Sequence, residues 1–466
     1  MALIKSISGI RGTIGGEPGN SLSPLDVVKF ASAFGSWVKN KTGNDKIIIG
    51  RDARPSGEMV SKLVSGALIS VGIEVIDIGL TTTPTVEIAV PEEKAGGGII
   101  ITASHNPVDW NALKLLNELG EFISAEDGNE ILNIVESESF EFSKVKKLGS
   151  YKMASQDYLD LHIEKILQLP LVDADAIKAR NFKIAIDCVN SSGAIAVPKL
   201  LSALGVENIV EFYCEPNGLF PHNPEPIPEN LTHICNEIEH GHYDLGIVVD
   251  PDVDRLAFIC EDGSPFGEEY TLVSVADYVL SKKQGNTVSN LSSTRALQDV
   301  TEKRGGEYFF AAVGEVNVVE AMKEYEAVIG GEGNGGIIYP KLHYGRDALV
   351  GIALFLSSLA EFGKSVRHLR TTFPNYYISK NKIELDPEID MDEIFRKMKL
   401  KYNNNPITTI DGIKIIFGKE WVHMRKSNTE PIIRIYAESE TLVTADHLAN
   451  KMIQDIREFI SESSIS

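Results

Sequence analysis

The sequence predicts three related α/β domains followed by a smaller α+β module. Its 466 residues, at about 150 residues per domain, correspond to roughly three domains. Short, continuously apolar segments alternate with helical segments, which is typical of layered α/β domains with largely parallel sheets. This long pattern occurs three times along the chain, and each copy ends in a polar loop.

The first copy ends at about residue 107. In order, it predicts a strand at 46–50, a polar turn at 51–55, a helix at 57–71, a strand at 72–79 and a Gly-rich strand at 96–101. The last of these strands leads directly into the loop 102–107, which reads Thr-Ala-Ser-His-Asn-Pro.

The second and third copies repeat this order and end in loops of different chemistry. The second copy predicts strands at 182–187, 206–213 and 245–249, a helix at 193–204, and an acidic loop at 250–255. The third predicts strands at 287–291, 307–310 and 327–329, a helix from about residue 294, and a Gly-rich loop at 330–336. Because open α/β sheets bind ligands at the carboxyl ends of their strands, the three loops predict a site where the domains meet.

The chain after about Phe373 follows another pattern, typical of a small α+β module. It predicts strands at 382–385, 412–417, 421–424 and 432–436, with helices at 389–402 and 445–460. A fourth polar loop, at 425–431, precedes the strand at 432–436.

The net charge excludes some classes of partner. With 45 Lys and Arg residues against 66 Asp and Glu residues, the chain carries −21, and such a surface repels nucleic acid. One or two arginine-lined pockets can still bind a small phosphorylated ligand. We therefore expect no nucleic-acid partner.

Two further features favour a cytoplasmic protein with no membrane partner. No apolar run approaches the about 20 residues of a membrane span, and the N-terminus lacks the apolar core of a signal peptide. The four cysteines form no C-x-x-C pair, so we expect reduced, mostly buried thiols.

The acidic loop predicts a metal site. Asp250, Asp252 and Asp254 follow an apolar strand, and carboxylates this close raise one another's pKa unless a cation lies between them. A hard divalent ion, Mg²⁺ first, fits best, and a solvated acidic turn is the alternative. An EF-hand is excluded because its sixth position would be Arg255 instead of Gly, and because strands flank the loop. Arg255 is better placed to bind an anion.

The remaining loops offer hydroxyl, carboxylate and guanidinium groups. Ser104 presents a hydroxyl in a sharp turn, although Ser, His, Asn and Pro are also common turn residues. Glu332 and the glycines after it open space for a ligand, or else form a hinge, and they lack the helix of a dinucleotide site. The fourth region combines the donors that a phosphate dianion requires, unless it is merely a solvated turn: Arg425, Ser427, Asn428, Thr429 and Arg434.

Five motifs in this order resemble those of the α-D-phosphohexomutases, the superfamily of phosphoglucomutase, phosphomannomutase and phosphoglucosamine mutase. They are Ser8-Gly9-Ile10-Arg11-Gly12 and the loops at 102–107, 250–255, 331–336 and 425–431, and they span nearly the whole chain. Segments 3–16 and 110–117 look most like bacterial phosphoglucosamine mutase.

The resemblance implies an architecture of three α/β domains with mixed sheets and a smaller C-terminal α+β domain around a central cleft. It divides the chain into a phosphoserine domain (1–153), a metal-binding domain (154–256), a sugar-binding domain (257–372) and a phosphate-binding domain (373–466). It also implies a monomer or a homodimer.

The implied reaction interconverts hexose 6-phosphate and hexose 1-phosphate. Glucosamine 6-phosphate is the expected substrate, with glucose or mannose phosphates as the alternative. Ser104 would carry a phosphoryl group and exchange it with the sugar through a hexose 1,6-bisphosphate, which also serves as activator. One Mg²⁺ per chain would bind Ser104 and the three aspartates Asp250, Asp252 and Asp254.

The same resemblance implies roles for residues around the transfer site. Lys114 would serve in acid–base chemistry, and Arg11, His105 and Arg255 would line the site. Glu332 and Asn334 would bind the sugar, and the last domain would open and close while its fourth loop holds the phosphate that does not react. That clamp would comprise Arg425, Ser427, Asn428, Thr429 and Arg434.

One departure from the family pattern leaves the choice of hexose open. Asn334 and Gly336 stand where many relatives have Ser and His, so this loop lacks a hydroxyl and an imidazole.

Two other classes of protein compete with the mutase. A phosphatase of the haloacid-dehalogenase type would use Asp250 as its nucleophile, but it would leave Ser104 without a role. A sugar-phosphate sensor would bind without turnover, although Ser104, Lys114 and the three aspartates are all present.

Overall fold

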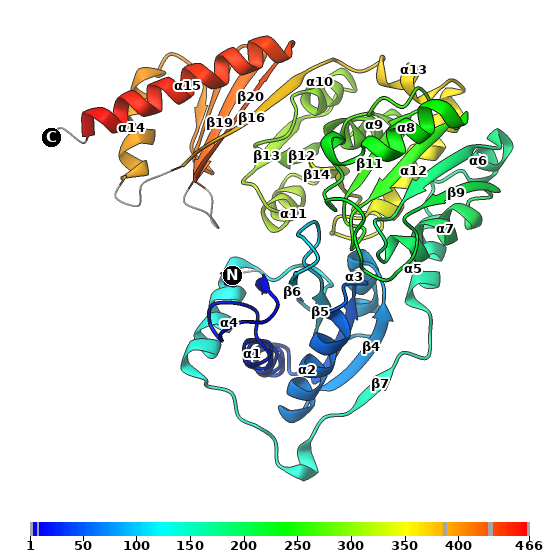
Figure 1. Cartoon of the computed structure of the whole chain (residues 1–466), viewed down its shortest axis with the longest axis vertical. Coiled ribbons are helices and arrows are strands. Elements are labelled where there is room, and N and C mark those ends of the chain that lie inside the picture. Colours follow the sequence, from blue (N-terminus) through cyan, green and yellow to red (C-terminus); the bar gives the residue numbers. More distant parts are fainter. Residues whose placement is uncertain (1–2, 7–8, 385–388, 427–431, 464–466) are drawn as a thin grey trace.

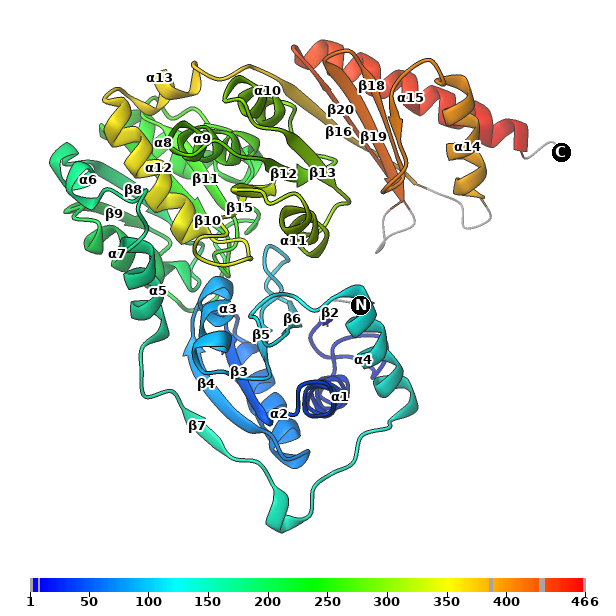
Figure 2. The same cartoon turned by 180° about the vertical axis from the view of Figure 1, so that it is seen from behind.

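The computed structural model describes residues 3–6, 9–384, 389–426 and 432–463. It contains four successive β-sheets of seven, four, four and five strands. The second and third sheets share one hydrophobic core, whereas the first and the last have cores of their own. Figures 1 and 2 accordingly show the middle two units packed together and the first and last units projecting from them.

The first unit is an α/β sandwich in the strand order β1-β2-β6-β5-β3-β4-β7. Its elements are β1 (Leu3–Ser6), β2 (Gly9–Thr13), α1 (Pro24–Thr42), β3 (Lys46–Arg51), α2 (Gly57–Ser70), β4 (Glu74–Leu80), α3 (Thr83–Glu92), β5 (Gly97–Ile101), β6 (Trp110–Leu116), α4 (Ala125–Ser137) and β7 (Tyr151–Met153). Side chains alternate across the sheet, so Ile47 and Ile49 pack in the core beside α1 and α2, whereas Ile48 packs beside α3.

The second and third units each have a four-stranded sheet, in the orders β11-β10-β8-β9 and β13-β12-β14-β15. The second comprises α5 (Tyr158–Leu167), α6 (Ala174–Arg180), β8 (Lys183–Asp187), α7 (Gly193–Ala203), β9 (Asn208–Phe212), α8 (Thr232–Gly241), β10 (Leu245–Val249) and β11 (Leu256–Cys260). The third comprises α9 (Glu268–Lys282), β12 (Thr287–Asn290), α10 (Ala296–Lys303), β13 (Tyr308–Ala311), α11 (Glu315–Glu324), β14 (Ile329–Glu332), β15 (Gly336–Ile338), α12 (Ala348–Phe362) and α13 (Val366–Arg370).

The last unit is an antiparallel sheet in the order β16-β20-β19-β18-β17. It comprises β16 (Tyr377–Glu384), α14 (Met391–Lys401), β17 (Ile407–Thr408), β18 (Ile413–Phe417), β19 (Glu420–Lys426), β20 (Ile432–Ser439) and α15 (Leu442–Ser463). The helices α14 and α15 cover one face of this sheet (Figures 1 and 2), where apolar residues of both helices and of the strands form one core.

The first three sheets are mixed, as the family resemblance implies. In the second and third sheets two of the three strand pairs are parallel, as the strand–helix alternation predicts. In each unit the strand before the polar loop has a parallel neighbour: β5 pairs with β3, β10 with β8, and β14 with β12. The strand after the loop then returns antiparallel, as β6, β11 and β15. Each polar loop therefore lies at the carboxyl end of a strand that has a parallel neighbour. The loop can be short because the strand after it is antiparallel, and a short connection joins only antiparallel neighbours.

The N-terminus of α12 places two charged residues at the centre of the molecule. Asp347 caps the helix by accepting hydrogen bonds from the backbone N–H groups of Leu349 and Val350. The helix is buried along most of its length and ends at Gly363, whose φ of 73° suits a glycine cap. The cap therefore fixes Asp347, and Arg346 beside it, at the junction of the units.

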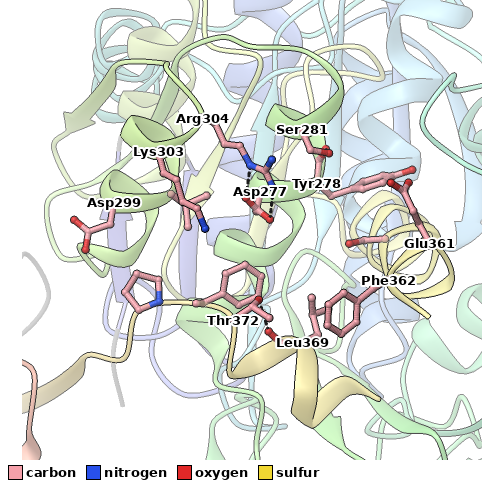
Figure 3. A pocket seen from close by; sticks show the side chains of 14 residues that line it. Asp277, Tyr278, Ser281, Asp299, Lys303, Arg304, Glu361, Phe362, Leu369 and Thr372 are labelled. Atoms are coloured by element: carbon pink, nitrogen blue, oxygen red, sulfur yellow. Dashed lines mark hydrogen bonds and ion pairs between the residues drawn. The ribbon is translucent and has the colours of Figure 1, made fainter. Parts of the chain in front are cut away.

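A connector between α13 and β16 links the last unit to the third. A cavity of about 700 Å³ borders this connector, and Figure 3 shows Arg304 on its wall paired with Asp277, with 2.7 Å between Nε and Oδ1. A second cavity of about 660 Å³ is lined by Arg370, the last residue of α13, and by Tyr376 of the connector. Both cavities therefore border the segment that joins the third and last units.

Two expectations about membranes and thiols can be compared with the fold. Over the ranges that the structure describes, no helix combines the length and the apolar character needed to cross a bilayer. The four cysteines carry free thiols; Cys188 and Cys260 are buried, and Cys214 and Cys235 are half-buried.

Candidate active site

The polar loops of all four units meet at a cavity of about 780 Å³. Its walls carry charged and amide side chains from each unit, among them Arg11, His105, Arg255, Glu332, Asn334, Arg346, Arg425 and Arg434. Seven of the fifteen residues that the sequence predicted for the site line this cavity.

Ser104 follows β5 in a strained turn. Its φ of 48° lies in the left-handed region, which serine seldom adopts, and its backbone N–H donates to Thr102 Oγ1 at 2.9 Å. Its Oγ donates to Asp250 Oδ2 at 2.7 Å and lies 3.4 Å from His105 Nδ1. The first and second polar loops, 146 residues apart in sequence, thus meet at the serine hydroxyl.

A buried arginine that we did not predict shapes this turn. Arg54 is 1% exposed, and its Nε donates to Asp52 Oδ2 at 3.0 Å. Its two terminal nitrogens donate to four backbone carbonyls of the serine loop, those of Ser104, Asn106, Pro107 and Trp110. The sequence signal that could have identified Arg54 is its position just after the carboxyl end of β3, which is the neighbour of β5. Ligand-binding loops lie at that edge of a sheet.

The three aspartates form a compact and fully buried cluster. One oxygen from each of Asp250, Asp252 and Asp254 lies within 4.8 Å of the others. Asp250 accepts from Ser104 with one oxygen and from two backbone N–H groups with the other. Asp252 Oδ1 and Asp254 Oδ1, by contrast, are buried with no hydrogen-bond partner among the described residues.

These unpaired oxygens fit a hard divalent cation. Mg²⁺ prefers carboxylate and hydroxyl oxygens, and the cluster offers only such atoms: the three aspartates and the hydroxyl of Ser104. A buried carboxylate oxygen without a donor is costly unless a cation compensates it.

The pKa values of the aspartates also favour a bound cation. Burial, followed by the charges of Asp254 and Asp252, raises the pKa of Asp250 well above its usual range. Burial also opposes ionisation of Asp254, but Arg346, Lys114 and Arg255 outweigh it and hold the pKa of Asp254 below its usual range. The protein's own cations therefore compensate only part of the acidic charge.

The aspartate loop is held by all three α/β units. Thr83, at the start of α3, donates from Oγ1 to Asp252 Oδ2 at 2.5 Å. Ser191 and Ser192 of the second unit both donate to the carbonyl of Pro251 at 2.7 Å. The backbone N–H of Ala348, in the third unit, donates to the carbonyl of Val253 at 3.1 Å. The loop geometry consequently depends on how the units pack together.

Lys114 lies on β6 and points at the aspartates. Its Nζ is 2.7 Å from Asp252 Oδ2 and 3.3 Å from Asp254 Oδ2. Burial favours the neutral amine, but the two carboxylates outweigh it and raise the pKa of Lys114. The amine is therefore protonated in this arrangement.

Three further predicted residues line the transfer site. Arg11 Nη1 donates to Asn106 Oδ1 at 2.9 Å, and Arg255 Nη1 donates to Glu225 Oε1 at 3.0 Å. Burial, followed by the charges of Arg255 and Arg11, holds the pKa of His105 well below its usual range, so its imidazole is neutral near pH 7. Sequence reasoning did not identify Glu225.

The sugar loop contributes Glu332 and Asn334. Glu332 ends β14; its Oε1 accepts from Asn290 Nδ2 at 2.8 Å, and its Oε2 accepts from Arg346 Nη1 at 2.9 Å. Asn334 Oδ1 accepts from the backbone N–H of Gly336 at 3.2 Å, which shapes the loop locally. Arg346 is a second residue that the sequence analysis missed.

The predicted phosphate clamp is described in part. Arg425 on β19 and Arg434 on β20 are direct partners across the strand pair, and both line the cavity. Two neighbouring guanidinium groups favour a bound anion, because an anion offsets their repulsion. Ser427, Asn428 and Thr429 lie outside the described residues, as does Ser8 of the first motif.

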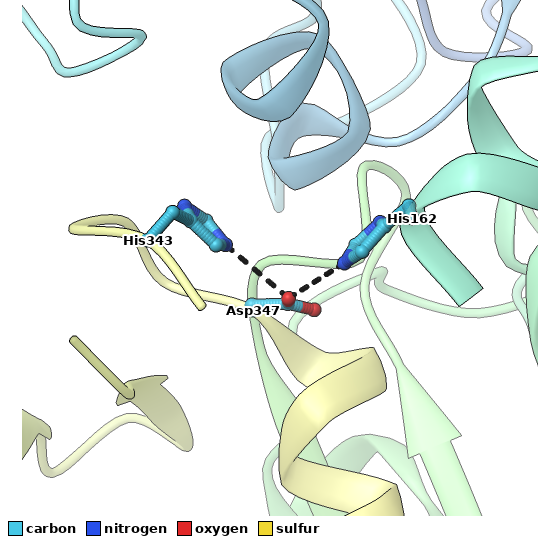
Figure 4. A group of neighbouring side chains, drawn as sticks. All are labelled: His162, His343 and Asp347. Atoms are coloured by element: carbon cyan, nitrogen blue, oxygen red, sulfur yellow. Dashed lines mark hydrogen bonds and ion pairs between the residues drawn. The ribbon is translucent and has the colours of Figure 1, made fainter. Parts of the chain in front are cut away.

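A histidine pair, His162 buried and His343 half-buried, joins the three α/β units. Figure 4 shows His162 and His343 on either side of Asp347; their Nε2 atoms lie 2.8 and 3.2 Å from the same carboxylate oxygen. His162 Nδ1 faces Thr85 Oγ1 at 3.0 Å, and His343 Nδ1 lies 3.3 Å from Glu87 Oε2. Three of the four ring nitrogens face a hydrogen-bond partner, whereas His343 Nδ1 and Glu87 Oε2 are close but make no hydrogen bond with each other. The cluster is therefore a network between units.

Comparison with known proteins assigns a family to all four units. Four family models match in order: the phosphoglucomutase/phosphomannomutase α/β/α domains I, II and III at residues 3–142, 160–263 and 267–377, and the C-terminal domain at 382–454. Together they cover most of the chain.

Full-length relatives agree with these matches. A phosphoglucomutase/phosphomannomutase of Thermococcus kodakarensis is 34% identical over 93% of this chain and 94% of its own. A phosphoglucosamine/phosphogalactosamine mutase of Sulfurisphaera tokodaii is 34% identical over 97% and 98%. A crystal structure of a phosphoglucomutase/phosphomannomutase family protein from Burkholderia thailandensis superposes with a TM-score of 0.85 at 25% identity, over 98% and 97% of the two chains. The chain therefore belongs to the phosphoglucomutase/phosphomannomutase family of the α-D-phosphohexomutase superfamily, resembles the phosphoglucosamine mutases within it, and is an isomerase that acts on hexose phosphates.

Proposed function

We propose that this chain interconverts glucosamine 6-phosphate and glucosamine 1-phosphate through a phosphoserine at Ser104 and a 1,6-bisphosphate intermediate. The observation that carries the proposal is the 2.7 Å hydrogen bond between Ser104 Oγ and Asp250 Oδ2. It places a hydroxyl that can carry a phosphoryl group directly beside the acidic cluster.

The chain's own residues supply positioning and proton transfer. As the phosphoryl group moves to a sugar hydroxyl, the bond between phosphorus and Ser104 Oγ breaks and a bond to the sugar oxygen forms. Protonated Lys114 lies 2.7 Å from Asp252, in the acidic cluster to which Ser104 also bonds. It would give a proton to Ser104 Oγ as the bond to phosphorus breaks and take up the proton that the sugar hydroxyl loses, so the net result is one proton moved from sugar to serine. Arg11 and Arg255 bring positive charge to the transfer site, whereas neutral His105 adds a hydrogen-bonding nitrogen.

Asp250, Asp252, Asp254 and Ser104 would hold one Mg²⁺. When bound, the ion would neutralise charge on the phosphoryl oxygens.

The sugar and its second phosphate would be held by the third and last units. Glu332 would accept hydrogen bonds from sugar hydroxyls, and Asn334 would offer an amide. Arg425 and Arg434, with Ser427, Asn428 and Thr429, would bind the phosphate that does not react. A single clamp and a single serine suffice if the bisphosphate turns over between the two half-reactions, which requires the last unit to open.

Each of the four domains would then supply one part of the active site. Residues 1–153 would supply the phosphoserine, 154–256 the metal site, 257–372 the sugar loop and 373–466 the phosphate clamp. The relatives support a hexose phosphate as substrate, and their names include both glucosamine and glucose or mannose mutases. Phosphoglucomutase or phosphomannomutase specificity is therefore the second candidate.

A coupled assay tests the proposal. The purified chain, with Mg²⁺ and a trace of hexose 1,6-bisphosphate, should convert glucosamine 6-phosphate with a higher kcat/KM than glucose 6-phosphate or mannose 6-phosphate. Glucosamine phosphate as the poorest substrate would overturn the substrate proposal. Release of inorganic phosphate instead of isomerisation would favour the phosphatase alternative, and binding without turnover would favour the sensor.

A further inference from the structure

We infer that Arg346 fills the space beside Gly336 and positions the sugar-binding carboxylate Glu332 against the metal-site carboxylate Asp254. The inference rests on the proposed function, because it takes Glu332 as a sugar ligand. Neither Arg346 nor its relation to Gly336 was foreseen from the loop motifs.

The first observation is steric. A Cβ built on Gly336 would lie 2.4 Å from Cδ of Arg346 and 3.1 Å from its Cγ. Real side chains do not approach so closely, so the methylene groups of Arg346 occupy the space that a side chain at position 336 would need. The glycine and the arginine are therefore complementary.

The second observation is the set of partners that hold Arg346 in this place. Its Nη1 donates to Glu332 Oε2 at 2.9 Å, and its Nη2 donates to Asp254 Oδ2 at 2.6 Å. Its Nε donates to Glu315 Oε2 at 3.0 Å, so three carboxylates pin the side chain. Arg346 is 8% exposed, and it cannot swing aside without leaving buried carboxylates unpaired.

The arrangement links two parts of the site that different units provide. Asp254 follows β10 in the second unit, Glu332 ends β14 in the third, and one planar guanidinium spans them. The three bonds use three of the five N–H groups of the arginine, and the residue lines the cavity. The two remaining donors are available to sugar oxygens.

This assigns Arg346 as a positioning and specificity residue. A donor-only group recognises acceptors such as hydroxyl oxygens, and its bond to Oε2 fixes the orientation of Glu332. Removing it should weaken sugar binding, and adding a side chain at position 336 should do the same by displacing it.

A double-mutant cycle tests the inference, with Gly336→Ala, Arg346→Ala and the double variant. We expect each single variant to raise KM for the hexose phosphate about tenfold, with a smaller change in kcat, and the double variant to be no worse than Arg346→Ala alone. Dissociation constants from titration calorimetry with glucose 6-phosphate should show the same non-additivity without turnover. Gly66→Ala is the matched control, because a Cβ at that exposed helix position meets nothing within 4 Å.

Two results would overturn the inference. One is Gly336→Ala with the KM and the dissociation constant of the wild type, a result that needs no folded Arg346→Ala variant. The other is a double variant whose loss equals the product of the two single losses. Because calorimetry needs no catalysis, either result is distinct from failure of the proposed function, which a lack of mutase activity in the wild-type chain would reveal.

Discussion

Arg54 donates a hydrogen bond to the backbone carbonyl of Ser104 at 2.5 Å, across 50 residues of sequence. The same guanidinium holds three more carbonyls of the loop and is itself neutralised by Asp52 at 3.0 Å. The serine turn is strained, so its geometry must be maintained by its surroundings. Arg54 maintains the geometry of the serine turn through its hydrogen bonds to the loop carbonyls.

Replacing Arg54 with Met should lower kcat by roughly 10- to 100-fold, because small displacements of a reacting group cost about that much. It should also lower the melting temperature, since Asp52 loses its buried partner. Steady-state kinetics and calorimetry measure both effects. The double variant Asp52→Asn/Arg54→Met should regain stability but not kcat; a wild-type kcat in Arg54→Met would exclude the assigned role.

His162→Ala should destabilise the packing of the three α/β units. The change leaves Asp347 without its 2.8 Å partner and opens a gap beside Thr85 in a fully buried network. Loss of a buried charged hydrogen bond costs about 1.5–3 kcal/mol, which lowers Tm by about 2–3 °C in a chain of this size. Thermal unfolding of His240→Ala, an exposed helix residue, is the control. Equal melting temperatures for the two variants would show that the network is dispensable.

Lys414 should make stability depend on pH in the alkaline range. It is buried between Trp421 and the carbonyl of Leu291, and burial, partly offset by Glu438, lowers the pKa of Lys414 to about 8. Between pH 8 and its ordinary pKa of 10.5 the unfolded chain binds more protons than the folded one, so this contribution to stability rises with pH. The difference in Tm between wild type and Lys414→Met should therefore change in favour of the wild type from pH 8 to pH 10. A constant difference would contradict the assignment.

Arg425→Ala should separate binding from chemistry. If the Arg425–Arg434 pair holds the phosphate that does not react, loss of one charged donor should raise KM about 10- to 100-fold and change kcat much less. Arg457→Ala is the matched control, since Arg457 is an exposed arginine on α15, outside the phosphate loop. A fall in kcat at unchanged KM would place Arg425 at the reacting phosphate instead.

The sequence predicted much of the architecture and of the site because both depend on local patterns. Apolar strands that end in polar loops identified the edges of the sheets, and Ser104 and Asp250 do meet there. The antiparallel return strands were missed, since apolar runs do not reveal strand direction.

The arginines that organise the site were also missed, for a physical reason. Arg54 and Arg346 act through backbone carbonyls and carboxylates from distant segments, and no local spacing records such partners. Gly336 was identified only as a departure from the family pattern. Its role depends on Arg346, which lies outside the loop motifs but packs against it in space.

The central claim is that Ser104 carries the phosphoryl group, and mass spectrometry tests it most directly. The enzyme is incubated with glucose 1,6-bisphosphate and Mg²⁺, digested, and the modified residue is located in the peptides. We predict phosphate on Ser104 in the wild type. In Ser104→Ala we predict neither phosphate on that peptide nor mutase turnover. Phosphate on Asp250, or full turnover by Ser104→Ala, would contradict it.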